Sequence, residues 1–343
     1  MIHIHHFLAA SLVATALAWS APVLAQATPT CEPGMRLFEN ALLLDGPVCV
    51  PDAPDRIAFI DDNVVYAMEL GIPTITRSYY SNIIVADFPG LAARLDPATT
   101  SDVGNTWEMK GEALLAAQPD LVVTAKYWDA AIGYARDIAP TIVIDDAKAA
   151  TWLDLPRMVA DLFGKQAEQA ALEADLQSRV AALRTALAAS GKGTSFTFTQ
   201  VEAADSFWTF TTDAFGPEFA VDVGMQPGPS IPTPEEAAKL PGGSRVALPV
   251  SQENLAFIDA DHLFFYANTG SDAEALVKDN PIFQKFAADR PGRIHFLKGE
   301  YWFRGSASSA HRIIDDIYRH VLGVEPRDVS PNPLAGTYES PAQ

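Results

Sequence analysis

Aromatic and cationic side chains recur at the ends of the predicted strands. Ligands of parallel α/β sheets bind beyond the carboxyl ends of the strands. A single Trp at such a place usually packs inside the protein. Several loops that each offer an aromatic ring beside a cation indicate instead a cleft for a large, partly aromatic, anionic ligand. Trp107 precedes a predicted helix, and the other residues of this kind follow or end strands: Arg77, Tyr79, Tyr80, Lys126, Tyr127, Trp128, Tyr266, Tyr301, Trp302 and Arg304.

Catalytic signatures are missing from the sequence. It contains no G-x-S-x-G, H-E-x-x-H, G-x-G-x-x-G or Walker motif. The histidines beyond residue 27 are spread along the chain, and structural roles are expected for them: His262, His295, His311 and His320. Ser306, Ser308 and Ser309 lie near His311, but we expect them to cap the last helix. An exported hydrolase would need a nucleophile and a base, and no such pair is evident.

The chain is strongly acidic. It has 343 residues with 24 Lys+Arg and 43 Asp+Glu, a formal net charge of −19 and a pI near 4.6. This balance excludes a nucleic-acid partner, because nothing basic is available to replace phosphate counterions. It does not exclude a small anionic ligand. A cleft for such a ligand would have to be a locally positive exception, and we expect Arg77, Lys126 and Arg304 to provide that charge.

Residues 1–27 resemble a secretory signal peptide. They contain no Asp, Glu, Lys or Arg, and an apolar run from Phe7 to Trp19 is followed by small residues that allow cleavage after Ala25 or Ala27. A membrane anchor is the alternative, but the run is shorter than the ~20 residues that a spanning helix needs. The mature protein is therefore expected to be soluble and exported.

Cys31 and Cys49 are the only cysteines. An oxidising compartment favours a disulfide between them, and the apolar arms around Asp45-Gly46-Pro47 predict a hairpin over residues 28–51. Two free buried thiols are the alternative. A metal site of cysteines alone is excluded, because two thiolates do not complete a tetrahedral ligand set.

Two α/β lobes flank a helical segment. Uninterrupted apolar runs separated by helices indicate a parallel sheet that is covered on both faces. The first lobe spans 52–150, with predicted strands RIAFI, IPTITRS, LVVTA and TIVI and helices at 63–70, 112–117 and 129–138. The second lobe spans 191–325, with predicted strands SFTFTQV, FWTFT, RVALPV, HLFFYA and RIHFL and helices at 253–258, 276–286 and 307–322. The tail, 326–343, is expected to be extended or disordered.

The segment 151–190 between the lobes is predicted to be helical. Residues 165–189 contain no Gly or Pro, and a leucine stripe faces one side: Leu172, Leu176, Leu183 and Leu187. At 1.5 Å per residue this helix would be roughly 37 Å long. That is about the width of a lobe, so one helix can bridge both lobes.

The order of these segments resembles that of the periplasmic binding proteins of iron-siderophore ABC transporters. The resemblance covers essentially all of the mature chain, and no single motif carries it. Its main blocks are RIAFIDDNVVYAMELGIP, VGNTWEMKGEALLAAQPDLVVTA, LFGKQAEQAALEADLQSRVAALR, VSQENLAFIDADHLFFY and NPIFQKFAADRPGRIHFLKGEYWFRGSASSAHRIIDDIYRHV. The fold that it implies has two α/β lobes with mainly parallel sheets, one connecting backbone helix and a ligand cleft between the lobes.

This resemblance also implies a function. Such a protein is a periplasmic monomer that captures a ferric siderophore and delivers it to the permease dimer of an inner-membrane ABC transporter. The siderophore holds the Fe³⁺, so neither a cofactor nor a direct metal ligand is expected. One exposed Glu on each lobe would dock to permease Arg residues, and Glu112 and Glu253 match these positions. Met109-Lys110-Gly111 departs from the family's Pro-Asn-Leu before the first of them.

Ligand contacts vary within this family, so the site residues are hypotheses. Arg77, Lys126 and Arg304 would meet the negative charge of a catecholate or carboxylate siderophore. The aromatic residues expected at the ligand are Tyr79, Trp107, Tyr127, Trp128, Trp208 and Trp302. Haem or cobalamin are alternative ligands within the class. Haem would need an axial His or Tyr, for which Tyr79, Tyr127 and Tyr301 are candidates.

Overall fold

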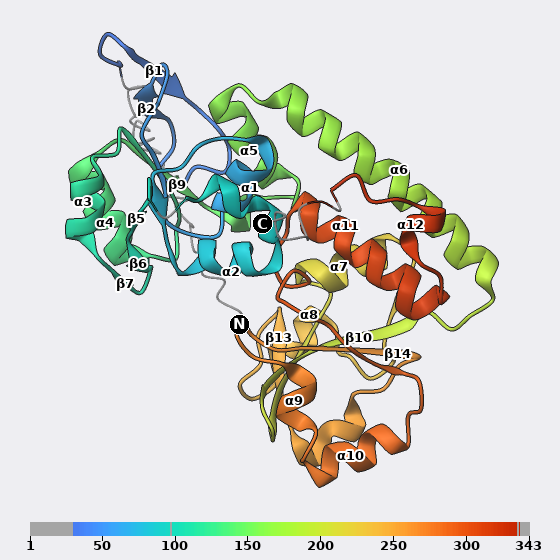
Figure 1. Ribbon diagram of the computed structural model, residues 1–343. Helices are drawn as coiled ribbons and strands as arrows, with labels where there is room; N and C mark the ends of the chain where they lie inside the picture. Colours follow the sequence, from blue (N-terminus) through green and yellow to red (C-terminus); the bar gives the residue numbers. More distant parts are fainter. Residues whose placement is uncertain (1–29, 97, 335, 337–343) are drawn as a thin grey trace, which may run out of the picture.

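The computed structural model describes residues 30–96, 98–334 and 336. The predicted signal peptide, residues 1–27, lies outside this part, as do residues 337–343 of the tail. Figure 1 shows two α/β regions joined along one side by the long helix α6 (Gln166–Ser190). The expected fold class, with mainly parallel sheets and one long connecting helix, is confirmed. None of the helices in the described residues has the length and apolar character that crossing a bilayer requires.

A disulfide-linked hairpin precedes the first lobe. Strands β1 (Met35–Phe38) and β2 (Val48–Pro51) pair antiparallel, and Cys31 is bonded to Cys49 with a Cα–Cα distance of 5.5 Å. The backbone N–H of Leu44 donates to the carbonyl of Val143 at 2.9 Å, which attaches the hairpin to the first sheet. The predicted pairing of the two cysteines is confirmed.

Removing this disulfide should destabilise the protein. The bond closes a loop of about 19 residues, so Cys31→Ser with Cys49→Ser should lower the free energy of unfolding by roughly 3 kcal/mol. Urea denaturation measures this loss, and the reduced wild type is the control, because it should unfold at the same midpoint as the double variant. An unchanged midpoint in the double variant would contradict the prediction.

The first sheet is parallel and entirely buried. Its strand order is β3 (Ile57–Phe59), β8 (Leu121–Ala125) and β9 (Thr141–Ile144). Helices cover both faces, which explains why these strands are apolar without alternation. The helical elements around this sheet are α1 (Val64–Leu70), α2 (Tyr79–Asp87), η1 (Pro89–Arg94), α3 (Gly111–Ala117), α4 (Asp129–Ile138), η2 (Asp146–Lys148) and α5 (Asp154–Phe163).

One strand predicted in this lobe forms only in small part. The segment IPTITRS contributes only β4 (Thr76–Arg77), which pairs with β5 (Ser101–Asp102) outside the main sheet. Helix α2 then begins at once, because Ser78 and Ser81 form a reciprocal capping box at its start. Tyr79 and Tyr80 therefore lie on a helix and not in a loop. A second small ribbon is formed by β6 (Gly104–Asn105) and β7 (Glu108–Met109).

The second sheet is mixed. β10 and β11 are joined by a tight turn and pair antiparallel, as do β11 and β13, whereas β10, β14 and β15 are parallel. Its strands are β10 (Ser195–Ala203), β11 (Ser206–Phe210), β12 (Gln226–Pro227), β13 (Ala247–Ser251), β14 (His262–Tyr266) and β15 (Ile294–Phe296). The helical elements of this half are α7 (Phe215–Asp222), α8 (Pro234–Ala237), η3 (Gln252–Phe257), α9 (Ala273–Val277), α10 (Pro281–Ala288), α11 (Ala307–Asp316), η4 (Ile317–Leu322) and α12 (Pro326–Val329).

The helix predicted over residues 276–286 is broken. α9 ends at Val277, and α10 starts at Pro281. Asn280 is the N-cap of α10, because its side chain accepts hydrogen bonds from the backbone N–H groups of Ile282 and Phe283. Pro281 fits the first position of α10, where a backbone N–H would have no partner within the helix. In the interior of one continuous helix the same proline would remove a hydrogen bond and break the helix.

Helix α6 buries most of its predicted leucine stripe. Leu176, Leu183 and Leu187 are buried. Arg179 is also buried, and it donates hydrogen bonds to the carbonyls of His311 (3.0 Å) and Ser330 (2.9 Å) and pairs with Asp315. The guanidinium of Arg179 therefore links α6 to α11 and to Ser330, which directly follows α12.

Two carboxylates that are at least partly buried join the two lobes directly. Glu69 accepts hydrogen bonds from the backbone N–H groups of Ser308 (2.7 Å) and Ala307 (3.3 Å) at the start of α11. Asp87 accepts one from the N–H of Glu300 at 2.9 Å. Because these hydrogen bonds connect residues of the first lobe to residues of the second, they fix the position of one lobe relative to the other.

Because of Asp87, the free energy of unfolding should decrease as the pH rises. Burial raises the pKa of Asp87 to about 7. The folded state therefore holds a proton that the unfolded chain releases near pH 4, and this contribution is lost as the pH rises through about 7. Asp87→Asn cannot ionise and keeps an acceptor for Glu300. We expect it to raise the free energy of unfolding at pH 8 by on the order of 4 kcal/mol, because the shift is about 3 pKa units and each unit corresponds to about 1.4 kcal/mol.

Urea denaturation between pH 5 and pH 8 measures this effect. The Asp87→Asn curve should be flatter than that of the wild type but not flat, because burial also raises the pKa of Asp61 to about 7. Curves that run parallel across this range would show that Asp87 does not carry the effect.

Candidate functional site

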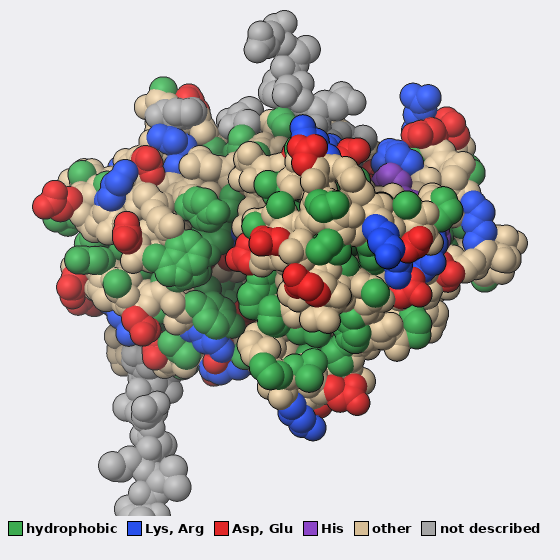
Figure 2. All heavy atoms as spheres, turned by 90° about the horizontal axis from the view of Figure 1, so that it is seen from below, with side chains coloured by type: hydrophobic (Ala, Val, Ile, Leu, Met, Phe, Trp, Pro, Cys, Tyr) green, Lys and Arg blue, Asp and Glu red, His purple; other side chains and the backbone are tan. Residues whose placement is uncertain are grey.

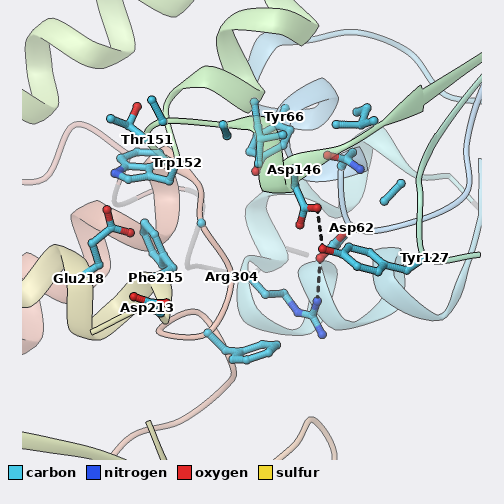
Figure 3. Close-up of a pocket in the computed structure, with 18 of the residues that line it drawn as sticks. Asp62, Tyr66, Tyr127, Asp146, Thr151, Trp152, Asp213, Phe215, Glu218 and Arg304 are labelled. Carbon is cyan, nitrogen blue, oxygen red and sulfur yellow. Dashed lines mark hydrogen bonds and ion pairs between the residues drawn. The ribbon is translucent and has the colours of Figure 1, made fainter. Parts of the chain in front are cut away.

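A cavity of about 400 Å³ lies between the two lobes (Figure 3). This volume is within the range of roughly 300–1,000 Å³ that is typical of small-molecule sites. Its first wall comes from the loops that follow β3, β8 and β9, at the carboxyl ends of these parallel strands. Its second wall comes from the segment before α5, from α7 and from the loop before α11.

Three of the predicted ligand residues line this cavity: Tyr127, Trp128 and Arg304. The Tyr127 hydroxyl donates a hydrogen bond to Asp146 at 2.6 Å. Burial and the hydrogen bond to Asp146 raise the pKa of Tyr127, so the hydroxyl stays protonated. The indole N–H of Trp128 is buried and has no hydrogen-bond partner among the described residues.

An aromatic cluster continues from Trp128 to the molecular surface. Its rings are those of Tyr79, Tyr80, Trp107 and Trp128, with centroids 4.9 Å apart for Trp107 and Trp128 and 5.8 Å apart for Tyr80 and Trp128. Trp107 is 58% exposed. In Figure 2, hydrophobic side chains gather where the two halves of the molecule meet, with acidic side chains close by. The predicted residues Tyr79 and Trp107 therefore extend the wall of the cavity without lining it.

The three predicted cations do not form a positive site. The guanidinium of Arg304 lies 4.9 Å from the ring centroid of Tyr80 and pairs with Asp62 and Glu300, each at 3.2 Å. Lys126 lies outside the lining and pairs with Asp145, whose pKa it lowers by a hydrogen bond. Arg77 is half-buried, also lies outside the lining, and its Nε has no hydrogen-bond partner in the described structure.

The cavity is in fact acidic. Four carboxylates line it, against the single guanidinium of Arg304: Asp62, Asp146, Asp213 and Glu218. The expectation of a locally positive cleft is therefore wrong. The sequence shows which residues are cations but not which of them pair with neighbouring carboxylates in the folded chain.

Two predicted tryptophans are not ligand residues in this geometry. Trp302 has 0% of its surface exposed, and its indole N–H donates to Asp316 at 2.9 Å. Trp208 lies on β11, outside the cavity lining, where its N–H donates to Glu202 at 3.1 Å. Trp302 follows a strand, but its side chain turns into the core and stacks on Phe264 at 4.9 Å between ring centroids.

Most of the second wall was not predicted from the sequence. Trp152 was not among the residues expected at the ligand, and α7, which carries Phe215 and Glu218, was not predicted. The rings of Trp152 and Phe215 meet edge to face at 5.2 Å. On the first wall, Asp62 lies three residues after the end of the buried strand β3, so the strand-end rule that identified Tyr127 could have identified Asp62 as well.

The two predicted docking residues are exposed on separate lobes. Glu112 lies in the first turn of α3 and Glu253 in the first turn of η3, where a carboxylate is favoured by the helix dipole. Hydrogen bonds from its own backbone and from the side chains of Ser251 and Gln252 lower the pKa of Glu253. Among the described residues, no cluster of His, Cys, Asp or Glu is arranged to hold a metal ion.

Two α/β lobes, one rigid connecting helix and an aromatic-walled cavity between the lobes define a solute-binding protein. The sequence pattern of the periplasmic binding protein family matches residues 85–301, and the chain belongs to this family. It is a family of binding proteins and not of enzymes, so the alternative of an exported hydrolase is set aside. No curated protein matches the chain.

Solved structures share the fold at low sequence identity. The FhuD protein from S. pseudintermedius is 19% identical, with a TM-score of 0.66 over 84% of this chain and 99% of its own. A FhuD-fold periplasmic binding protein component of a Fep/Fec-like ferrichrome ABC transporter from Bacillus subtilis is 20% identical, with a TM-score of 0.64 over 82% and 99%. Staphylococcus aureus SirA, solved with staphyloferrin B, is 18% identical, with a TM-score of 0.64 over 84% and 98%.

Proposed function

We propose that this protein captures a ferric siderophore between its lobes and delivers it to the permease of an inner-membrane ABC transporter for iron uptake. The observation that carries the proposal is the inter-lobe cavity with aromatic walls in a periplasmic-binding-protein fold. A signal peptide at residues 1–27 would place the mature chain in the periplasm, where it would act as a monomer.

Among its described residues, the cavity offers aromatic and polar groups but no set of metal ligands. A chelate that brings its own donor atoms suits such a cavity, because Trp128 and Trp152 can contact its organic framework while the iron stays within the chelator. The names of the structural neighbours support iron chelates in general, since they include both ferrichrome and staphyloferrin B.

Haem has weaker support than a siderophore. It would need an axial ligand, and no histidine lines the described cavity. The hydroxyl of Tyr127 stays protonated and donates a hydrogen bond to Asp146, while the buried hydroxyl of Tyr301 donates one to Asp316. Tyr79 is exposed but lies outside the lining.

Gel filtration after mixing the full mature chain with ferric chelates, haem or cobalamin tests the proposal. A ferric siderophore should coelute with the protein and give a broad visible charge-transfer band. A Soret band in the protein peak would instead identify haem as the ligand. The elution volume also reports whether the protein is a monomer.

Delivery requires a contact with the permease. We propose that Glu112 and Glu253 provide it, one from each lobe, by pairing with permease Arg residues. Their exposure on opposite lobes supports this role, because a partner that touches both would sense how the lobes are arranged.

A further inference from the structure

The charge of the cavity bears on which chelates it accepts. Arg304 is the only cation among the described residues that line it, and its guanidinium is already paired with Asp62 and Glu300. The hydrogen bond from the N–H of Thr269 to Glu300 at 2.6 Å helps to hold this arrangement in place. An anionic ligand could use Arg304 only by displacing these carboxylates.

The other cations near the cavity are either paired with carboxylates or lie outside the lining. Lys126 pairs with Asp145 beside the first wall. At the second wall, Arg245 pairs with Asp213 at 2.8 Å and with Glu235 at 2.6 Å. Arg77 has no ion pair in the described part of the chain, but it does not reach the lining. The cavity therefore offers an anion no unpaired cation among the described residues.

The second wall has the composition of a site for a cationic group. Figure 3 shows Trp152, Phe215, Asp213 and Glu218 grouped on one side of the cavity, opposite Tyr127. Phe215 and Glu218 are three residues apart on α7 and share a face. The side-chain carboxylate of Glu218 has no ion pair or hydrogen bond among the described residues, so it is available to a ligand. Aromatic faces beside a free carboxylate favour an ammonium group.

We propose that the cleft selects ferric chelates that are neutral or carry a pendant cationic group, as trihydroxamates can, and that Glu218 receives this group. Highly anionic tris-catecholates are disfavoured, because the described lining offers them no unpaired cation and presents the unpaired carboxylate of Glu218. This inference rests on the proposed function. Partial burial and the neighbouring charges of Asp222 and Asp213 raise the pKa of Glu218, so the preference should be stronger at pH 8 than at pH 5.

Tryptophan-fluorescence titration of the full mature chain tests the charge preference. The probes are the ferric complex of desferrioxamine B, which has a free ammonium, its neutral N-acetyl derivative and a trianionic ferric tris-catecholate. We expect the cationic complex to bind about 10-fold more tightly than the acetylated one, and the tris-catecholate at least about 100-fold more weakly.

Glu218→Gln assigns the effect to one residue. It should remove about 10-fold of affinity for the cationic complex and change the acetylated one by less than about 2-fold. Glu274→Gln is the matched control, since it removes the same charge from an exposed site on α9 and should change neither. If the tris-catecholate binds tightest, or acetylation does not weaken binding, the inference is overturned while the proposed function stands. If no ferric chelate binds, the inference and the proposed function both fail.

Discussion

Charge reversal at both docking positions, Glu112→Arg with Glu253→Arg, is expected to reduce iron uptake at least about 10-fold without changing the affinity for the chelate. Both side chains are exposed, and neither lines the cavity. The substitution therefore leaves the fold and the ligand site intact, while it places two cations against the Arg residues expected on the permease. Like charges at an interface are costly even where opposite charges add little affinity.

Uptake of radioactive iron by cells that express the variant measures this effect, and titration of the purified variant measures its affinity for the ligand. The matched control reverses the charge of two other exposed carboxylates, Asp175 on α6 and Glu274 on α9. This control should take up iron normally. Normal uptake in the Glu112/Glu253 variant would show that these residues are not the docking points.

Trp128→Ala is expected to weaken chelate binding at least about 10-fold, the loss expected when an aromatic anchor is removed from the wall of a binding site. Trp128 lines the cavity and supports Tyr80 and Trp107 through ring contacts. Its removal takes apolar contact from the ligand and loosens the cluster behind it. Equilibrium dialysis with a radioiron chelate is the suitable measurement, because it does not depend on tryptophan fluorescence.

Trp208→Ala is the matched control for this variant. The sequence placed both tryptophans at the ligand, but Trp208 lies on β11 away from the cavity. Its substitution should therefore leave the dissociation constant within about 2-fold of the wild type. Equal losses in the two variants would mean that the ligand does not lie in this cavity. Urea denaturation of both variants separates a loss of binding from a loss of fold.

The elements with the strongest local signals were predicted well. The buried strands β3, β8 and β9 are uninterrupted apolar runs, and α4 begins and ends at the predicted residues, 129 and 138. The long helix α6 differs from its prediction by one residue at each end. These signals are periodicity and chain breakers, which need no knowledge of the tertiary structure.

The missed helix α7 shows where local signals fail. Gly216 and Pro217 suggest a loop, but Pro is tolerated in the first turn, where its missing N–H would have no intrahelical partner. Gly216 lies so close to the carbonyl of Trp302 that a Cβ would be 2.3 Å from its oxygen. A tertiary contact, and not helix propensity, thus determines the residue at this position.

The site was predicted in part because only one of its walls follows a simple rule. Tyr127 and Trp128 follow a parallel strand, and the strand-end rule places them at the cavity. The same rule failed for Trp302, because sequence position does not reveal whether a side chain turns into the core. The charge of the cavity was mispredicted because ion pairs such as Arg304 with Glu300 form only in the folded chain.

Mass spectrometry of the ligand that copurifies with the protein from iron-starved cells tests the central claim most directly. The account predicts one organic chelator per protein, recovered with one iron atom, and a broad visible charge-transfer band in the purified complex. Recovery of haem with a Soret band, or of a ligand that does not bind iron, would contradict it.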